Sequence, residues 1–173
     1  MAITLYDVSV ANYLQTLSAV DQYLQKGLAH CQETNIPADD VLGRRLFEDM
    51  MPFQYQVHSV THHAVGAIAA LRSGVFRPGG TNRNDDYAAL QALVTQSCDS
   101  LRAVSPAEIN DREGAEVVVE AGNVRTAFTA VNFILSFSLP NFYLHAVAVF
   151  DILRSYDVPF RKRDFIGATR MKK

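Results

Sequence analysis

The sequence has few cysteines, no excess of either charge and no recognisable leader segment. Cys31 and Cys98 lack the CxxC spacing of zinc knuckles and redox pairs, so we expect both to be small core residues. Lys and Arg total 16 against 18 Asp and Glu, and a net charge of −2 gives no reason to expect nucleic acid as a partner. The first six residues carry no basic segment followed by a long apolar one, so we expect a cytoplasmic protein.

Motifs of common enzyme classes are also missing. The sequence contains no GxSxG nucleophile elbow, no Walker phosphate loop and no GxGxxG dinucleotide fingerprint, so no catalytic residue can be named from a motif. What is present is 173 residues that are 49% hydrophobic, which is typical of a compact globular unit. We therefore expect one domain over residues 1–173.

One long segment has no charged residue at all. Residues 126–150 contain no Asp, Glu, Lys or Arg and are about long enough to span a bilayer. The segment is interrupted by polar residues and by Pro140, and the other predicted helices each have one apolar stripe that needs an apolar partner. We therefore expect a buried central helix and no membrane.

Apolar residues that recur at spacings of three and four predict four long helices, over about 8–33, 52–74, 87–101 and 129–155. In the last of these, Pro140 predicts a break or kink, because proline removes a helical hydrogen bond. Asp21 interrupts the apolar stripe of the first helix. It is either a carboxylate at the rim beside a packed Val20, or a buried carboxylate that holds a histidine.

Shorter elements are expected between these helices. Residues 39–49 are predicted to form a short helix with Leu42, Leu46 and Phe47 turned inward. The remaining expectations are a surface loop at 75–84 and a small β-hairpin of strands 116–120 and 124–128. The sequence thus predicts an all-α helical bundle, with a short helix before the second long helix and a hairpin before the fourth.

The candidate site residues are histidines and one asparagine on two of these helices. Asn141 and His145 are four residues apart on the fourth helix, and His58 and His62 share a face of the second. If the two faces meet, His58, His145 and a third group form a site for zinc or nickel; each histidine could instead be a hydrogen-bonded core residue. His63 points about 100° away from His62, so a packing or solvated role is expected.

The charges are unevenly distributed. The last twenty residues carry seven basic and two acidic side chains, a net charge of +5, whereas the remaining residues carry −7. We expect this basic tail to dock on the acidic body or on a partner subunit, with an anion site or a nucleic-acid contact as the alternative. The apolar helices and the basic tail together predict a homodimer.

Several segments resemble an uncharacterised family of the DinB/YfiT-like superfamily. They are Leu-Pro-Asn-Phe-Tyr-Leu-His at 139–145, Ile-Leu-Arg at 152–154, Val-Pro at 158–159, Lys-Arg-Asp-Phe-Ile-Gly at 162–167 and the opening Leu-Tyr-Asp-Val-Ser-Val at 5–10. The resemblance implies an up-down-down-up four-helix bundle that is often dimeric. It also implies a metal held by one histidine of helix two and an HxxxH pair of helix four.

Carried onto this sequence, the second histidine of the HxxxH pair is His145 and the first is Asn141, a departure from the pattern. The helix-two ligand is His58, with His62 as the alternative. A carboxamide is a weaker ligand for zinc or nickel than an imidazole, so the metal site is degenerate. Two functions follow: a metal-dependent enzyme of hydrolase or thiol-dependent transferase type, or a non-catalytic small-molecule-binding or dimeric interaction module that has lost the metal. The sequence names no ligand.

Overall fold

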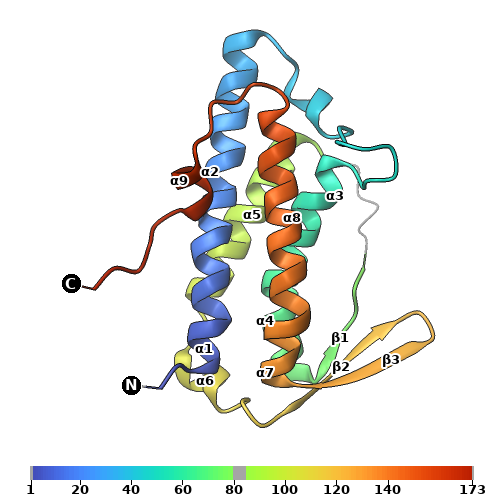
Figure 1. The fold of residues 1–173 in the computed structure, drawn as a ribbon, viewed down its shortest axis with the longest axis vertical. Coiled ribbons are helices and arrows are strands. Elements are labelled where there is room, and N and C mark those ends of the chain that lie inside the picture. Colours follow the sequence, from blue (N-terminus) through green and yellow to red (C-terminus); the bar gives the residue numbers. More distant parts are fainter. Residues whose placement is uncertain (1, 80–84, 173) are drawn as a thin grey trace.

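Four long helical segments form the body of the protein in the computed structural model, which describes residues 2–79 and 85–172 (Figure 1). They are α2 (Val10–Thr34); α3 (Phe53–Thr61) continued by η2 (His62–Gly66) and α4 (Ala67–Ser73); α5 (Tyr87–Arg102); and α7 (Ala130–Asn132) continued by η3 (Phe133–Ser138) and α8 (Leu139–Arg154). Helix α2 contacts α5 and α8, and α3 contacts the same two helices. The molecule is mostly helical, with one small sheet.

The predicted apolar stripes meet in one core. Its largest fully buried side chains are aromatic, and burial of each stabilises the fold by about 1.5–3 kcal/mol. They are Tyr13, Tyr23, Phe53, Phe76, Phe133 and Phe142. Cys31 and Cys98 are buried in the same core, which confirms the role expected for them. Asp21 lies at the rim, where it accepts hydrogen bonds from Gln25 and Thr95, while Val20 is fully buried.

Two of the four segments contain a π-helical turn, which the sequence pattern does not predict. One is η2, in the middle of the second segment, and the other is η3, directly before α8. The expected break at Pro140 is absent, because the helix continues from Ala130 to Arg154. The widened turns of η3 lie just before Pro140, which occupies the first turn of α8. The missing proline N–H is thereby accommodated by a change of helix type rather than by a break.

The sheet lies at one end of the bundle (Figure 1). Strands β2 (Glu116–Ala121) and β3 (Val124–Thr129) pair antiparallel, and Gly122 takes the positive φ of 57° that their tight turn requires. Strand β1 (Val75–Phe76) pairs parallel with β2, so the expectation of a loop is wrong for these two residues. Phe76 is a strand residue because its backbone pairs with β2 opposite Val119, and its ring is buried in the core. Residues 80–84 of the expected loop lie outside the described residues.

Four short helices complete the described parts of the chain: α1 (Leu5–Val8), η1 (Ala38–Val41), α6 (Pro106–Asn110) and α9 (Lys162–Ile166). The short helix expected over 39–49 is wrong, since only the 3-10 turn η1 forms there. Leu46 is 38% and Phe47 is 75% exposed, so neither is turned inward. Six of these eleven residues are charged, and too little apolar surface remains to hold a helix against the bundle.

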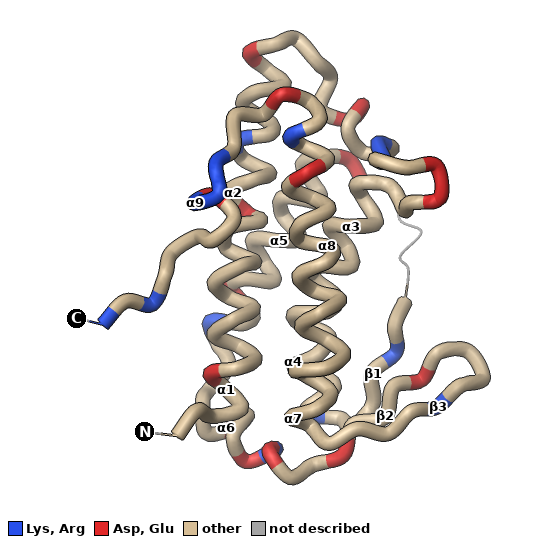
Figure 2. Tube along the Cα trace, in the orientation of Figure 1, with Lys and Arg blue, Asp and Glu red and all other residues tan. Residues whose placement is uncertain are grey.

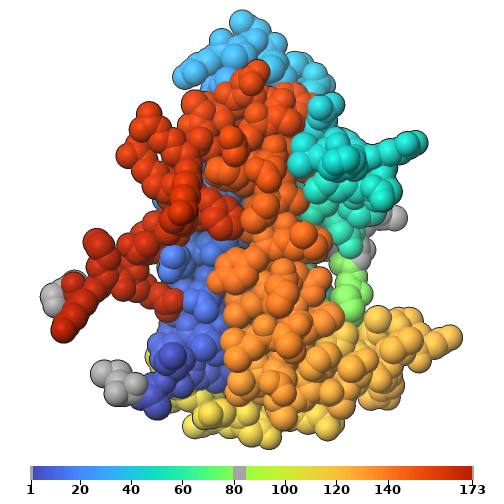
Figure 3. Space-filling view, in the orientation of Figure 1, coloured from blue at the N-terminus to red at the C-terminus, as the bar shows by residue number. Residues whose placement is uncertain are grey.

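The uncharged segment is part of the bundle but is covered on one side only. By its length and composition, the helix Ala130–Arg154 could cross a membrane, but these two properties alone are weak evidence for a membrane span. Half of its most apolar stretch is buried in the protein. Figure 3 shows the orange atoms of this segment uncovered along the front of the molecule. Leu135 in η3 and Leu144 in α8 are 47% and 65% exposed. The expectation of a buried helix therefore holds for one face.

The C-terminal segment docks on α2, as Figures 1 and 2 show. Gln15 donates a hydrogen bond to the carbonyl of Ile166 (3.0 Å), and Lys26 forms an ion pair with Asp164. The tail thus supplies the acidic partner of this ion pair, and its basic residue Arg170 also contacts α2, where it donates a hydrogen bond to Oδ1 of Asn12 (2.6 Å). Figure 2 shows the positions of the basic residues along α9 and the segment beyond it.

Candidate functional site

The two π-helical turns contact each other through a buried hydroxyl. The Ser138 hydroxyl donates to the carbonyl oxygen of His63 (2.8 Å) and accepts a hydrogen bond from the Tyr13 hydroxyl (2.7 Å). Tyr13 and Ser138 are fully buried, and His63 is 6% exposed. This chain of hydrogen bonds ties α2, η3 and η2 together at one level of the bundle. It fixes the backbone that carries His63, and π-helical turns occur frequently at functional sites.

His63 lies in a layer of aromatic rings beside His145. The two imidazoles stack with their centroids 5.8 Å apart and an interplanar angle of 22°. The His63 ring also contacts Phe76 (5.3 Å) and Phe137 (5.9 Å). Its Nδ1 atom is buried and has no hydrogen-bond partner among the described residues. His63 therefore has the packing role that was one of its two expected roles, with one polar atom left unsatisfied.

Gln56 fixes the protonation of His145. The Gln56 Nε2 atom donates to the carbonyl of Met51 (2.8 Å), which orients the amide so that its Oε1 atom faces Nδ1 of His145 at 2.7 Å. A carbonyl oxygen only accepts, so Nδ1 of His145 carries the proton and Nε2 keeps its lone pair. Gln56 is 5% exposed, and this hydrogen bond is accordingly protected from water.

Both stacked imidazoles are neutral at neutral pH. Burial lowers the pKa of His63 to about 3, and His145 and His62 beside it disfavour a further positive charge. Burial also lowers the pKa of His145. The pair therefore offers nitrogen lone pairs and no positive charge, which suits hydrogen bonding or coordination but gives no attraction for an anion. We call Gln56, His63 and His145 the histidine cluster.

The predicted ligands other than His145 contact different neighbours. His58 is 6% exposed, and its Nε2 atom lies 3.0 Å from a carboxylate oxygen of Asp85. Nε2 of His62, the alternative ligand, lies 2.8 Å from the carbonyl oxygen of Arg77. Asn141 donates its amide to the carbonyl of Phe137 in the preceding turn (2.7 Å). These contacts do not bring His58, Asn141 and His145 together.

A metal centre needs several converging donors. Within residues 2–79 and 85–172, no three His, Cys, Asp or Glu side chains form a group that could hold a metal ion. As they lie, the predicted ligands do not fit a three-donor site, because each is engaged with its own neighbour. The metal site at His58, Asn141 and His145 stays a prediction.

Sequence reasoning missed Gln56 and Asp85 and did not select His63 as a site residue. Gln56 and His63 are seven residues apart, a spacing that places both on one helical face. The sequence pattern could therefore have indicated Gln56 as a neighbour of His63. The π turn was not readable, and it adds a residue to the turn that contains His62 and His63. Asp85 comes directly after the segment that the sequence predicts to be a loop, where no periodicity indicates the direction of a side chain.

Comparison with known proteins identifies the family of the sequence and the class of its fold. The sequence pattern of a family described as a domain of unknown function, DUF1993, matches residues 5–166. The fold is similar to the crystal structure of a DinB family member protein from Shewanella denitrificans, with a TM-score of 0.82 at 22% sequence identity, covering 98% of this chain and 95% of that one. No curated protein matches the chain. Because the family pattern spans nearly all of the sequence, the chain belongs to the DUF1993 family, and its fold is DinB-like.

Proposed function

We propose that this DinB-like chain is a non-catalytic, dimeric small-molecule-binding module in which the histidine cluster has a structural role. The observation that carries the proposal is the separate engagement of the three predicted metal ligands. His58 faces Asp85, Asn141 bonds to its own helix, and His145 bonds to Gln56. In this arrangement the imidazole of His145 is a half-buried side chain that is hydrogen-bonded through Nδ1 to Gln56, as expected of a bundle that has lost its metal.

The proposal includes the up-down-down-up order that the family resemblance implies. Figure 1 supports this order, because α2 and α8 run in one direction while α3–α4 and α5 run in the other. In this order α2 is a neighbour of α5, and α3 is a neighbour of α8. The histidine cluster lies between the second and fourth segments, where Gln56 of α3 bonds to His145 of α8. The site is thus determined by the packing of two long helices rather than by a loop.

A second candidate is a metal-dependent enzyme of hydrolase or thiol-dependent transferase type. One observation favours it: a proton on Nδ1 of His145 leaves the Nε2 lone pair free, which is how metal-bound histidines are held by a second partner. Such a site would need further donors, and the stacked His63 is the nearest imidazole. Zinc or nickel would suit nitrogen donors of this kind.

Thermal unfolding with added metal separates the two candidates. Tag-free protein is heated with and without equimolar zinc or nickel, together with His145→Ala and the control His30→Ala, which removes a histidine outside the cluster. We expect the metal-induced change in melting temperature to be the same in all three proteins. A rise in the wild type and in His30→Ala that is lost in His145→Ala would contradict the proposal and favour the enzyme.

The dimer is proposed from the surface of the fourth segment. Leu135, Tyr143 and Leu144 are exposed along η3 and α8, within the stretch 126–150 that carries no charge. A second copy fits this face, because the basic tail of one copy complements the acidic body of another. Burial of these side chains supplies the apolar part of the contact.

A further inference from the structure

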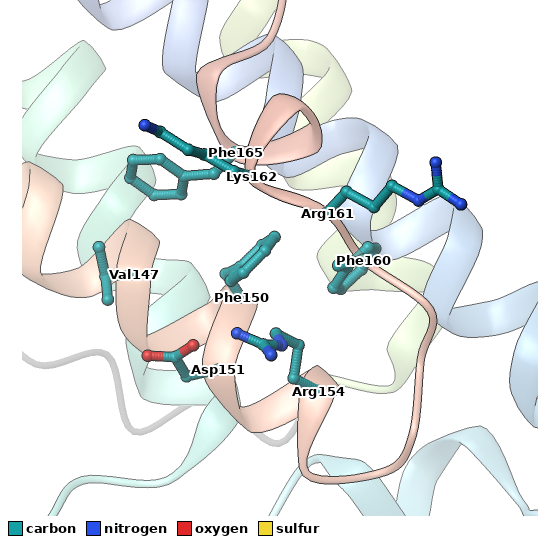
Figure 4. A pocket seen from close by; sticks show the side chains of 8 residues that line it. All are labelled: Val147, Phe150, Asp151, Arg154, Phe160, Arg161, Lys162 and Phe165. Carbon is teal, nitrogen blue, oxygen red and sulfur yellow. The ribbon is translucent and has the colours of Figure 1, made fainter.

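A cavity of about 320 Å³ lies between the end of α8 and the C-terminal segment that folds back over it (Figure 4). Asp157 takes a positive φ of 62°, and the chain reverses direction there. Three phenyl rings line the cavity: Phe150 stacks on Phe160 at 4.9 Å and meets Phe165 edge-on at 5.8 Å. Phe160 and Phe165 are only half-buried, so they present ring surface to the cavity.

Three cationic side chains surround these rings. Arg154, Arg161 and Lys162 line the cavity and are exposed. In Figure 4 Arg154 and Lys162 lie on opposite sides of the Phe150 ring, whereas Arg161 points outward. Within the described parts of the chain none of the three has a carboxylate oxygen within 4.0 Å, in contrast to paired surface cations elsewhere such as Arg72 and Arg125.

The acidic residues nearby leave this charge largely uncompensated. Asp151 is the acidic side chain in the lining, against three cations, so the cavity carries a net charge of +2. Asp164 on α9 is engaged by Lys26 and by the backbone N–H of Arg161. The half-exposed phenyl rings can contact an apolar group of a ligand, and the unpaired cations beside them can bind a negative charge of the same ligand.

We infer that this cavity binds an apolar monocarboxylate, with its ring or chain against Phe165 and Val147 and its carboxylate between Arg154 and Lys162. The inference rests on the proposed function, since it names the ligand class of that binding module. The volume is at the lower end for ligand pockets, which fits an acid of one or two rings. The cavity shares no residue with the histidine cluster, so the two sites can be tested separately.

Calorimetric titration with 2-naphthoate tests the carboxylate part, and 2-naphthamide is the matched neutral probe. We expect saturable binding of the acid and at least fivefold weaker binding of the amide. Lys162→Gln should weaken naphthoate binding two- to fivefold, the range for a solvent-exposed charge. The control Arg163→Gln removes the same charge from the same helix outside the lining and should change the affinity less than twofold. Equal affinity for acid and amide, or equal effects of the two substitutions, would overturn the inference.

Val147→Glu tests the location with a change that the fold can accept, because Val147 is 40% exposed. The new carboxylate should reduce naphthoate affinity more than tenfold. Val124→Glu makes the same change at a 63% exposed position on β3 and should leave the affinity unchanged. Undiminished binding by Val147→Glu would place the ligand elsewhere and overturn the inference.

A failure of this inference can be distinguished from a failure of the proposed function. Metal-induced stabilisation that depends on His145, together with naphthoate binding that depends on Val147, would refute the metal-free role and keep the cavity. Absence of naphthoate binding by a protein that also shows no His145-dependent metal effect would refute the cavity alone.

Discussion

His145 has two neutral tautomers, and the orientation of Gln56 selects one of them. The Met51 carbonyl accepts from the Gln56 amide, so the Gln56 oxygen faces the imidazole and can only receive a proton. Gln56 is buried and His145 is half-buried, so the hydrogen bond between them is partly protected from solvent. This hydrogen bond therefore contributes to the stability of the fold and also determines which ring nitrogen of His145 carries the proton.

A double-mutant cycle measures that hydrogen bond. We expect Gln56→Ala and His145→Ala each to reduce the free energy of unfolding by about 1–3 kcal/mol, because each removes the hydrogen-bond partner of a polar side chain that is buried (Gln56) or half-buried (His145). The double mutant should lose less than the sum of the two, since its second change removes a group that is already unpaired. Urea unfolding followed by circular dichroism gives the values. Additive losses would mean that the two side chains do not interact.

His63 should make the fold sensitive to acid. Its folded-state pKa of about 3 lies below its ordinary value of 6.5, so the unfolded chain binds the proton more readily between these values. Its contribution to stability is therefore complete above pH 6.5 and is lost as the pH falls toward 3, by at most about 1.4 kcal/mol per pH unit. His63→Phe, which keeps a ring against Phe76 and Phe137, should have a flatter profile over this range.

The control for the pH profile is His30→Gln, at a histidine outside the aromatic layer. Unfolding free energies of all three proteins are compared from pH 7 to pH 4. Carboxylates contribute equally to each profile, so the difference between His63→Phe and the wild type reports His63. Parallel profiles for His63→Phe and the wild type would show that the imidazole is not protected from protonation.

At the scale of elements, the two π turns are locked together by one serine. Ser138→Ala removes both the donor to the His63 carbonyl and the acceptor of the Tyr13 hydroxyl, which is fully buried. We expect a loss of about 1–3 kcal/mol in the free energy of unfolding. Tyr13→Phe/Ser138→Ala should recover part of this loss, because the orphaned hydroxyl is removed. A double mutant less stable than Ser138→Ala would contradict this account.

The sequence predicts elements well where apolar periodicity is strong and poorly where tertiary contacts decide. The stripes of α2 and α5 follow from spacings of three and four, and both helices form close to the predicted limits. The π turns and β1 are not predictable in this way, because Phe76 becomes a strand residue only through pairing with β2. At 39–49 an apparent apolar face is too small to outweigh six charges.

The candidate site shows the same limit. Spacing identified His145 as a residue of the bundle interior, and it could not identify its partner, because Gln56 lies on another helix. His58 and His62 share a face in a regular helix, but each contacts its own neighbour, Asp85 for one and Arg77 for the other. Register across two helices depends on the packing of both, and one sequence does not specify it.

At the scale of the whole molecule, the apolar face of α8 predicts association. Light scattering at micromolar concentration should give twice the 19.2 kDa mass of the chain. Leu144→Glu, at a 65% exposed position on this face, should give a monomer, because a carboxylate would be buried against apolar side chains. Val124→Glu is the control and should remain dimeric. A monomeric wild type would refute the proposed dimer.

The most direct test of the central claim is the metal content of tag-free protein. Elemental analysis is made after purification without chelator, on the wild type and on His145→Ala, in parallel. A bundle whose predicted ligands are engaged with other side chains should contain far less than one zinc or nickel per chain, with no difference between the two proteins. One equivalent of either metal in the wild type, lost in His145→Ala, would contradict the account.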